Sequence, residues 1–175
     1  MKNLLISAGA AAVLALTATP AAAAASATSV SANANAQAKI YRPLSITNNQ
    51  GLDFGTLVLS GTGTYSTPVA VAQGGTLTYD NTYITPSGTT QAATFTVKGT
   101  SNQNVNITLP QTSVSLTGSN GGTLSLTLDA PTVEALGSAG PTTGVTFGVG
   151  GSLTLTNLTT DGVYTGTFAV NADYQ

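Results

Sequence analysis

Residues 123–128 read Thr-Leu-Ser-Leu-Thr-Leu, so leucines alternate with small hydroxyl side chains. A period of two places Leu124, Leu126 and Leu128 on one face of an extended strand and leaves the other face polar. The same alternation recurs along most of the chain. Its other members are Leu52, Phe54, Phe95, Val97, Val105, Ile107, Leu109, Val114, Leu116, Val145, Phe147, Val149, Leu153 and Leu155.

Turn-forming residues separate these segments at fairly even spacing. The turns are expected at 61–63, 74–75, 86–88, 101–102, 120–122, 140–141 and 161–162. Many short strands, each with one polar face, predict an all-β fold, namely an antiparallel Ig-like or pilin-like β-sandwich. No fixed repeat is present, so we expect one sandwich domain at residues 39–175. Residues 132–137 are expected to form one turn at most.

The end of the chain predicts one closing strand. Its expected apolar side carries Tyr164, Phe168, Val170, Ala172 and Tyr174, with polar residues on the other side.

The most regular alternation lies near the start of the chain, at residues 30–40. Val30, Ala32, Ala34, Ala36, Ala38 and Ile40 carry methyl groups, and the residues between them are polar. We call residues 30–40 the N-terminal ribbon. The pattern predicts a strand whose apolar face must be covered by a sheet, either in its own domain or in another copy of the chain.

The first 24 residues have the features of a secretory signal peptide. Lys2 gives a positive start, residues 4–16 are apolar but too short to span a bilayer comfortably, and the small residues at 21–25 suit cleavage near Ala24 or Ala25. Residues 25–38 would then form an N-terminal extension of the mature protein. No later stretch is apolar enough to span, so the mature form is expected to have no integral membrane segment.

The composition excludes several functions. The chain has no His, Cys or Trp, and only 6% of its residues are charged. Without His or Cys there is no imidazole base, no thiolate and no usual zinc site, so we expect neither an enzyme nor a cofactor. After signal cleavage the cations are Lys39, Arg42 and Lys98, which are too few for nucleic-acid binding.

Three further patterns have ordinary structural explanations. The carboxylates of Asp129 and Glu134 lie close in sequence but are interpreted as solvated loop charges rather than a catalytic pair. Asp80 and Asn81 are interpreted as an Asx-turn rather than a calcium site. Alternating threonines at 76–78 and 153–156 resemble a hydroxyl array for ice or carbohydrate, but strand propensity alone explains them.

The two ends of the mature chain resemble the bacterial domain-of-unknown-function 4402 family. Residues 38–46 and 52–55 carry the first part of the resemblance, and residues 162–168 with a Tyr near the end carry the second. The residues taken as family motif or core are Pro43, Leu44, Leu52, Asp53, Phe54, Gly55, Tyr164, Phe168 and Tyr174. The same ends are similar to pilin-like domains of the spore-coat U and chaperone–usher type, although the Cys pair of many of those domains is absent.

The resemblance implies an exported bacterial protein associated with chaperone and usher components. The first expectation is therefore a structural or adhesive fimbrial subunit, whose residues 25–38 complete the sandwich of the next copy. Its partners would be other copies, a periplasmic chaperone and an outer-membrane usher, between the periplasm and the surface of a Gram-negative-type bacterium. The alternative is a self-complete monomeric secreted or periplasmic protein with a binding or adhesive role.

Overall fold

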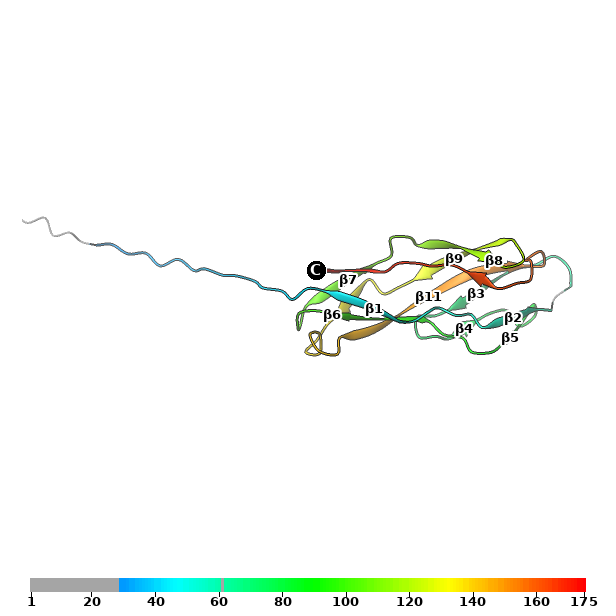
Figure 1. The fold of residues 1–175 in the computed structure, drawn as a ribbon, viewed down its shortest axis with the longest axis horizontal. Coiled ribbons are helices and arrows are strands. Elements are labelled where there is room, and N and C mark those ends of the chain that lie inside the picture. Colours follow the sequence, from blue (N-terminus) through cyan, green and yellow to red (C-terminus); the bar gives the residue numbers. More distant parts are fainter. Residues whose placement is uncertain (1–28, 61) are drawn as a thin grey trace, which may run out of the picture. The chain divides into compact units, whose positions relative to one another are not determined.

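A computed structural model describes residues 29–60 and 62–175 (Figure 1). The predicted signal peptide and residues 25–28 of the extension lie outside the described residues. The compact sandwich unit begins at Lys39 and ends at Gln175. Its strands are β1 (Ser45–Gln50), β2 (Thr56–Leu59), β3 (Ser66–Val71), β4 (Leu77–Thr78), β5 (Ile84–Ser87), β6 (Ala93–Lys98), β7 (Asn104–Thr108), β8 (Ser113–Gly118), β9 (Thr123–Asp129), β10 (Val133–Ala135), β11 (Val145–Thr156), β12 (Tyr164–Thr165) and β13 (Asn171–Tyr174).

Antiparallel pairing joins these strands into three sheets, which confirms the predicted all-β sandwich. The largest sheet has the order β1-β6-β11-β9-β8-β12, and β3 joins it by pairing with β11 and β4. A second sheet has the order β10-β7-β13, and the third is the pair β2-β5. In the described part of the chain no helix is long and apolar enough to cross a membrane.

Strand β11 is the central element of the sandwich. It pairs with β6 through residues 145–149, with β9 through 150–152 and with β3 through 151–156. The alternation at 145–149 and that at 153–155 belong to this one continuous strand. Glycine at position 148 lets the backbone of residue 73 approach β11 closely, because a Cβ there would collide with the carbonyl oxygen of Gln73.

Apolar side chains form two core clusters. The first contains Phe95, Val97, Val105, Ile107, Phe147 and Val149 among others. The second contains Val69, Ile84, Val114, Leu116, Leu126, Leu128, Leu153 and Leu155. Leu52, Leu109 and Phe168 are partly buried and pack against both clusters. The leucines of residues 123–128 therefore point into the core, as their period predicts.

The predicted single closing strand is wrong. Residues 164–165 form β12 and pair with β8, whereas 171–174 form β13 and pair with β7 in another sheet. Residues 166–170 belong to no strand and connect the two sheets. Gly166 passes so close to β8 that an added Cβ would lie 2.6 Å from a methyl carbon of Leu116. The predicted turn at 132–137 is also wrong, because Val133–Ala135 is β10 and pairs with β7.

Residues 29–44 belong to no strand. Within the ribbon the side chain of Val30 is 94% exposed and that of Ile40 is 87% exposed. The four alanines between them are exposed as well. The strand predicted at 30–40 is therefore not formed in the described chain. An isolated strand leaves its backbone N–H and C=O groups without partners, so alternation alone does not stabilise it.

Candidate functional site

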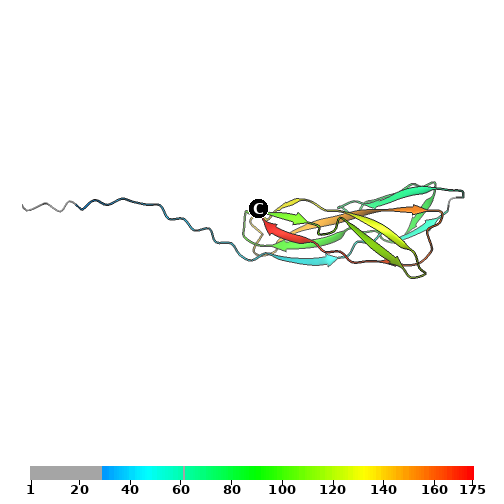
Figure 2. The same ribbon diagram turned by 90° about the horizontal axis from the view of Figure 1, so that it is seen from above.

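Two sheets of the sandwich end in neighbouring strands whose outer edges pair with no other strand in the described part of the chain. β1 is the first strand of the largest sheet, and β13 is the last strand of the second sheet. Both strands run beside each other at the same end of the sandwich, where β1 is cyan and β13 is red in Figure 2. We call the outer edges of β1 and β13 the open edges. Unpaired edges of this kind offer N–H and C=O groups to another strand.

The apolar residues beside the open edges are only partly buried. They are Leu44, Ile46, Leu52, Phe168 and Ala172. In contrast, the inward side chains of the central strands β6 and β7, such as Val97 and Val105, are fully buried. Covering the partly buried set would remove further apolar surface from water, at about 25 cal/mol per Å². The open edges therefore combine backbone and apolar binding groups.

Tyr174 fixes the chain where it enters β1. Its hydroxyl donates a hydrogen bond to the carbonyl oxygen of Arg42 at 2.6 Å and accepts one from the amide of Thr100 at 2.7 Å. The Arg42 amide in turn donates to the hydroxyl of Thr100. The ring of Tyr41 packs against the Tyr174 ring, with 4.8 Å between centroids. The last strand therefore holds residues 41–42 in place at the beginning of β1.

Other residues of the family motif form a tight turn. The Asp53 carboxylate accepts a hydrogen bond from the Gly55 amide at 2.8 Å, and the Asp53 backbone exchanges two hydrogen bonds with Gln91. Gly55 has φ +69°, and a Cβ there would lie 2.9 Å from the Ser87 carbonyl oxygen. Phe54 between them packs against the second core cluster. Pro43, which precedes β1, is exposed.

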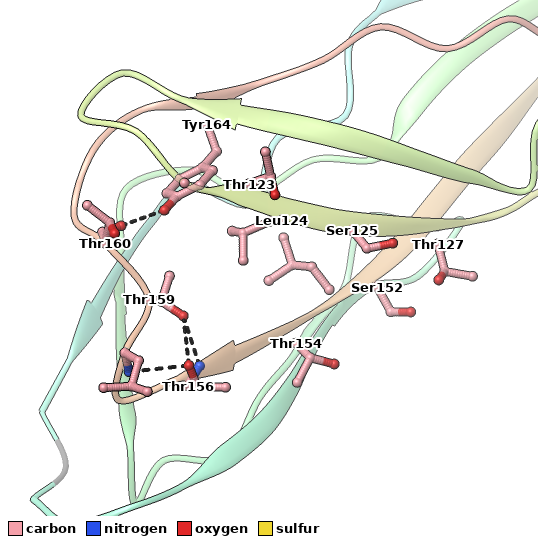
Figure 3. Close-up of a pocket in the computed structure, with 13 residues that line it drawn as sticks. Thr123, Leu124, Ser125, Thr127, Ser152, Thr154, Thr156, Thr159, Thr160 and Tyr164 are labelled. Atoms are coloured by element: carbon pink, nitrogen blue, oxygen red, sulfur yellow. Dashed lines mark hydrogen bonds between the residues drawn. The ribbon is translucent and has the colours of Figure 1, made fainter.

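A cleft of about 510 Å³ opens on another part of the sandwich, where β9 and β11 diverge (Figure 3). Its walls carry hydroxyl side chains of both strands, including Thr123 and Ser125 of β9 and Thr154 of β11. Tyr164 of β12 lines the same cleft. The threonines at 153–156 were interpreted as strand formers from the sequence. Their position in one cleft with hydroxyl side chains about thirty residues away has no local sequence signal, because it depends on sheet topology.

The loop positions predicted for Asp129 and Glu134 are wrong, because Asp129 is the last residue of β9 and the partly buried Glu134 is in β10. The Asp129 carboxylate accepts a hydrogen bond from the Gln73 side chain at 3.1 Å, whereas Glu134 lies on β10. Partial burial raises the pKa of Glu134 above its usual value. The Asp80 carboxylate accepts a hydrogen bond from the Thr82 amide at 2.9 Å, which confirms the predicted Asx-turn. Among the described residues no group of acidic side chains is arranged to hold a metal ion.

Comparison with known families identifies the chain. The family model "Domain of unknown function (DUF4402)" matches residues 44–174, and the chain belongs to this family. The match includes β1, β13 and all the strands between them. No curated protein and no solved structure matches the chain.

Proposed function

We propose that this DUF4402 protein is an exported structural subunit of the fimbrial type, which assembles when the N-terminal ribbon of one copy pairs with the open edges of the next. In this proposal residues 25–38 act as the donor segment. The partners are further copies of the chain, with a periplasmic chaperone and an outer-membrane usher during assembly. The assembled protein would lie on the cell surface and serve in adhesion.

The observation that carries the proposal is that the apolar face of the ribbon is exposed to solvent. The ribbon has a continuous apolar face, yet Val30 is 94% exposed and residues 29–44 belong to no strand. The open edges of β1 and β13 offer the complementary feature, because their inward side chains are only partly buried. The ribbon could therefore donate and accept backbone hydrogen bonds at the open edges while its apolar face covers their partly buried side chains.

Backbone pairing would supply most of the binding energy. About ten backbone hydrogen bonds, each worth a net 0.5–1.5 kcal/mol, would contribute roughly 5–15 kcal/mol. The side chains would add less, since an alanine contributes about one methyl group, worth about 0.8 kcal/mol. We therefore expect a joint that depends on its hydrogen-bond ladder and on Val30 and Ile40 as the larger anchors.

A pair of adjacent substitutions tests the proposal in the mature full chain. Ala34→Asp places a negative charge on the apolar face of the ribbon, and Asn35→Asp places the same charge on the polar face. Burying an unpaired carboxylate costs several kcal/mol, whereas a solvated one costs little. We expect Ala34→Asp to abolish assembly and Asn35→Asp to preserve it, as measured by light scattering and electron microscopy.

The folding of the isolated subunit separates the two functions considered for this chain. Strand donation requires that Ala34→Asp leave the thermal unfolding of the monomer unchanged. If Ala34→Asp lowers the unfolding temperature of a monomer that never assembles, the ribbon pairs within its own sandwich and the protein is a self-complete monomer. If both variants assemble like the unmodified protein, the ribbon is not the donor.

A further inference from the structure

The cleft between β9 and β11 is created by a fork in the largest sheet. The two strands pair only where residues 127–129 face 150–152. Beyond this point β9 continues beside β8, while β11 continues beside β3. The side chain of Leu124 lies between the diverging strands, with hydroxyl side chains of both strands near it (Figure 3). The buried Leu153 of β11 also lines the cleft. The cleft thus combines apolar and hydrogen-bonding surface.

Several hydroxyl groups in the cleft are available to a ligand. Among the described residues, the hydroxyls of Thr123, Thr127, Ser152 and Thr154 are not used in hydrogen bonds. Ser125, in contrast, shares a hydrogen bond with Ser113 at 2.9 Å. Each free hydroxyl is both a donor and an acceptor, so the four can match a ligand that itself carries hydroxyl groups.

Tyr164 lies at one end of the cleft in a fixed orientation. Its hydroxyl donates a hydrogen bond to the carbonyl oxygen of Thr160 at 2.6 Å (Figure 3). Gly118 gives the ring its space, because an added Cβ there would lie 2.9 Å from a ring carbon. A partly buried aromatic ring in a hydroxyl-lined cleft offers an apolar surface for C–H groups beside polar groups for O–H groups.

We propose that this cleft binds a short neutral saccharide. None of the residues that line the described cleft is charged, so neither a phosphate nor a carboxylate would find a counter-ion there. A purely apolar ligand would leave the free hydroxyls desolvated and unpaired. The volume of about 510 Å³ falls within the roughly 300–1,000 Å³ range of small-molecule sites. The inference rests on the cleft alone and goes beyond strand donation, which uses the edges of β1 and β13.

Isosteric substitutions of the hydroxyls test this inference. The mature chain is applied to an array of neutral saccharides, and backbone NMR shifts are followed with free galactose, glucose, mannose, fucose and N-acetylglucosamine at millimolar concentration. The double variant Thr123→Val with Thr154→Val removes two free hydroxyls but keeps the strand-forming shape. Thr85→Val is the matched control, because Thr85 is an exposed threonine of β5 outside the cleft.

We expect binding of at least one neutral saccharide, with shifts confined to residues 122–127 and 152–164. The double variant should bind about tenfold more weakly, since each hydrogen bond contributes a net 0.5–1.5 kcal/mol, while Thr85→Val should bind normally. The inference is overturned if no saccharide on the array or in solution binds, or if the double variant binds as tightly as the control. It is also overturned if a peptide of residues 25–38, rather than a saccharide, shifts the cleft residues.

The same measurements on Ala34→Asp keep the two proposals separate. This variant should not assemble, yet its cleft is unchanged, so it should retain saccharide binding. Loss of assembly with retained binding would support both proposals. Failure of saccharide binding in a protein that assembles would remove only the present inference.

Discussion

Strand β11 and the N-terminal ribbon both alternate apolar and polar residues, but only β11 has neighbours that cover its apolar face. Phe147 and Val149 of β11 are buried between paired strands, whereas Val30 and Ile40 of the ribbon are exposed. β11 has ladder partners along its whole length, and residues 29–44 belong to no strand. The contrast indicates that a period of two defines an apolar face. Whether the segment forms a strand depends on neighbouring strands that pair with its backbone.

The largest effect is expected where β11 is most crowded. Gly148→Ala would drive a Cβ into the carbonyl oxygen of Gln73, and backbone at a central strand has little room to shift. We expect a loss of about 3 kcal/mol in the free energy of unfolding, measured by urea denaturation.

Gly74→Ala is the matched control for this substitution. Gly74 is next to Gln73 in sequence, has nothing within 4 Å of an added Cβ and does not have a positive φ. Its unfolding free energy should change by less than about 0.5 kcal/mol. Equal effects of the two substitutions would show that the close passage of β11 past residue 73 does not stabilise the sandwich.

An intermediate effect is expected at the junction between the two regions. Tyr174→Phe removes the hydroxyl that joins the Arg42 carbonyl to the Thr100 amide. The partly buried Thr100 amide would lose its acceptor, so we expect a loss of about 1–3 kcal/mol in unfolding free energy. Hydrogen exchange at residues 41–46 should quicken as the entrance to β1 loosens.

Tyr41→Phe provides the comparison for the junction. Among the described residues the Tyr41 hydroxyl makes no hydrogen bond, and its ring contact with Tyr174 would remain. Its unfolding free energy should stay within about 0.5 kcal/mol of that of the unmodified protein. If Tyr174→Phe behaves like Tyr41→Phe, the hydroxyl network does not hold the beginning of β1.

The sequence predicted most strands of the sandwich, but its most regular alternation, in the ribbon, forms no strand. The strand expected around Leu52 and Phe54 is wrong as well, because only an isolated bridge at Asp53 forms there. The turn predicted at 86–88 is also wrong, because Pro86 and Ser87 belong to β5.

The sequence did not single out β3 and β5, although Val69, Val71 and Ile84 in these strands are among the most buried residues. Pro68 and Pro86 interrupt their alternation. In the described structure each proline lies where its strand has a single neighbour, which is the edge position at which sheets tolerate a residue without an N–H.

The candidate sites depend on topology more than on local pattern. The ribbon is visible in the sequence because its pattern is local. The open edges are not, since they require that residues 45–50 and 171–174 each end a sheet and lie side by side. The cleft likewise depends on the fork between residues 123–126 and 153–156. Alternation in the sequence predicts which face of a strand is apolar, but it does not predict which strands lie next to it.

The smallest effect on folding, with a large effect on assembly, is expected in the ribbon. Val30→Ala removes apolar groups from a side chain that is 94% exposed, so the unfolding free energy of the monomer should change by less than about 0.5 kcal/mol. In an assembled joint the same side chain would be buried. Its loss would then cost about 1.6 kcal/mol, which weakens subunit association about tenfold.

Ser31→Ala completes this comparison, because Ser31 lies on the polar face of the ribbon and should not affect association. Sedimentation velocity at several concentrations would measure both variants. A substitution that acts on association but not on monomer folding requires a face that becomes buried only between copies. If Val30→Ala instead destabilises the monomer and Ser31→Ala does not, the apolar face is already covered within the chain, and the contrast between β11 and the ribbon disappears.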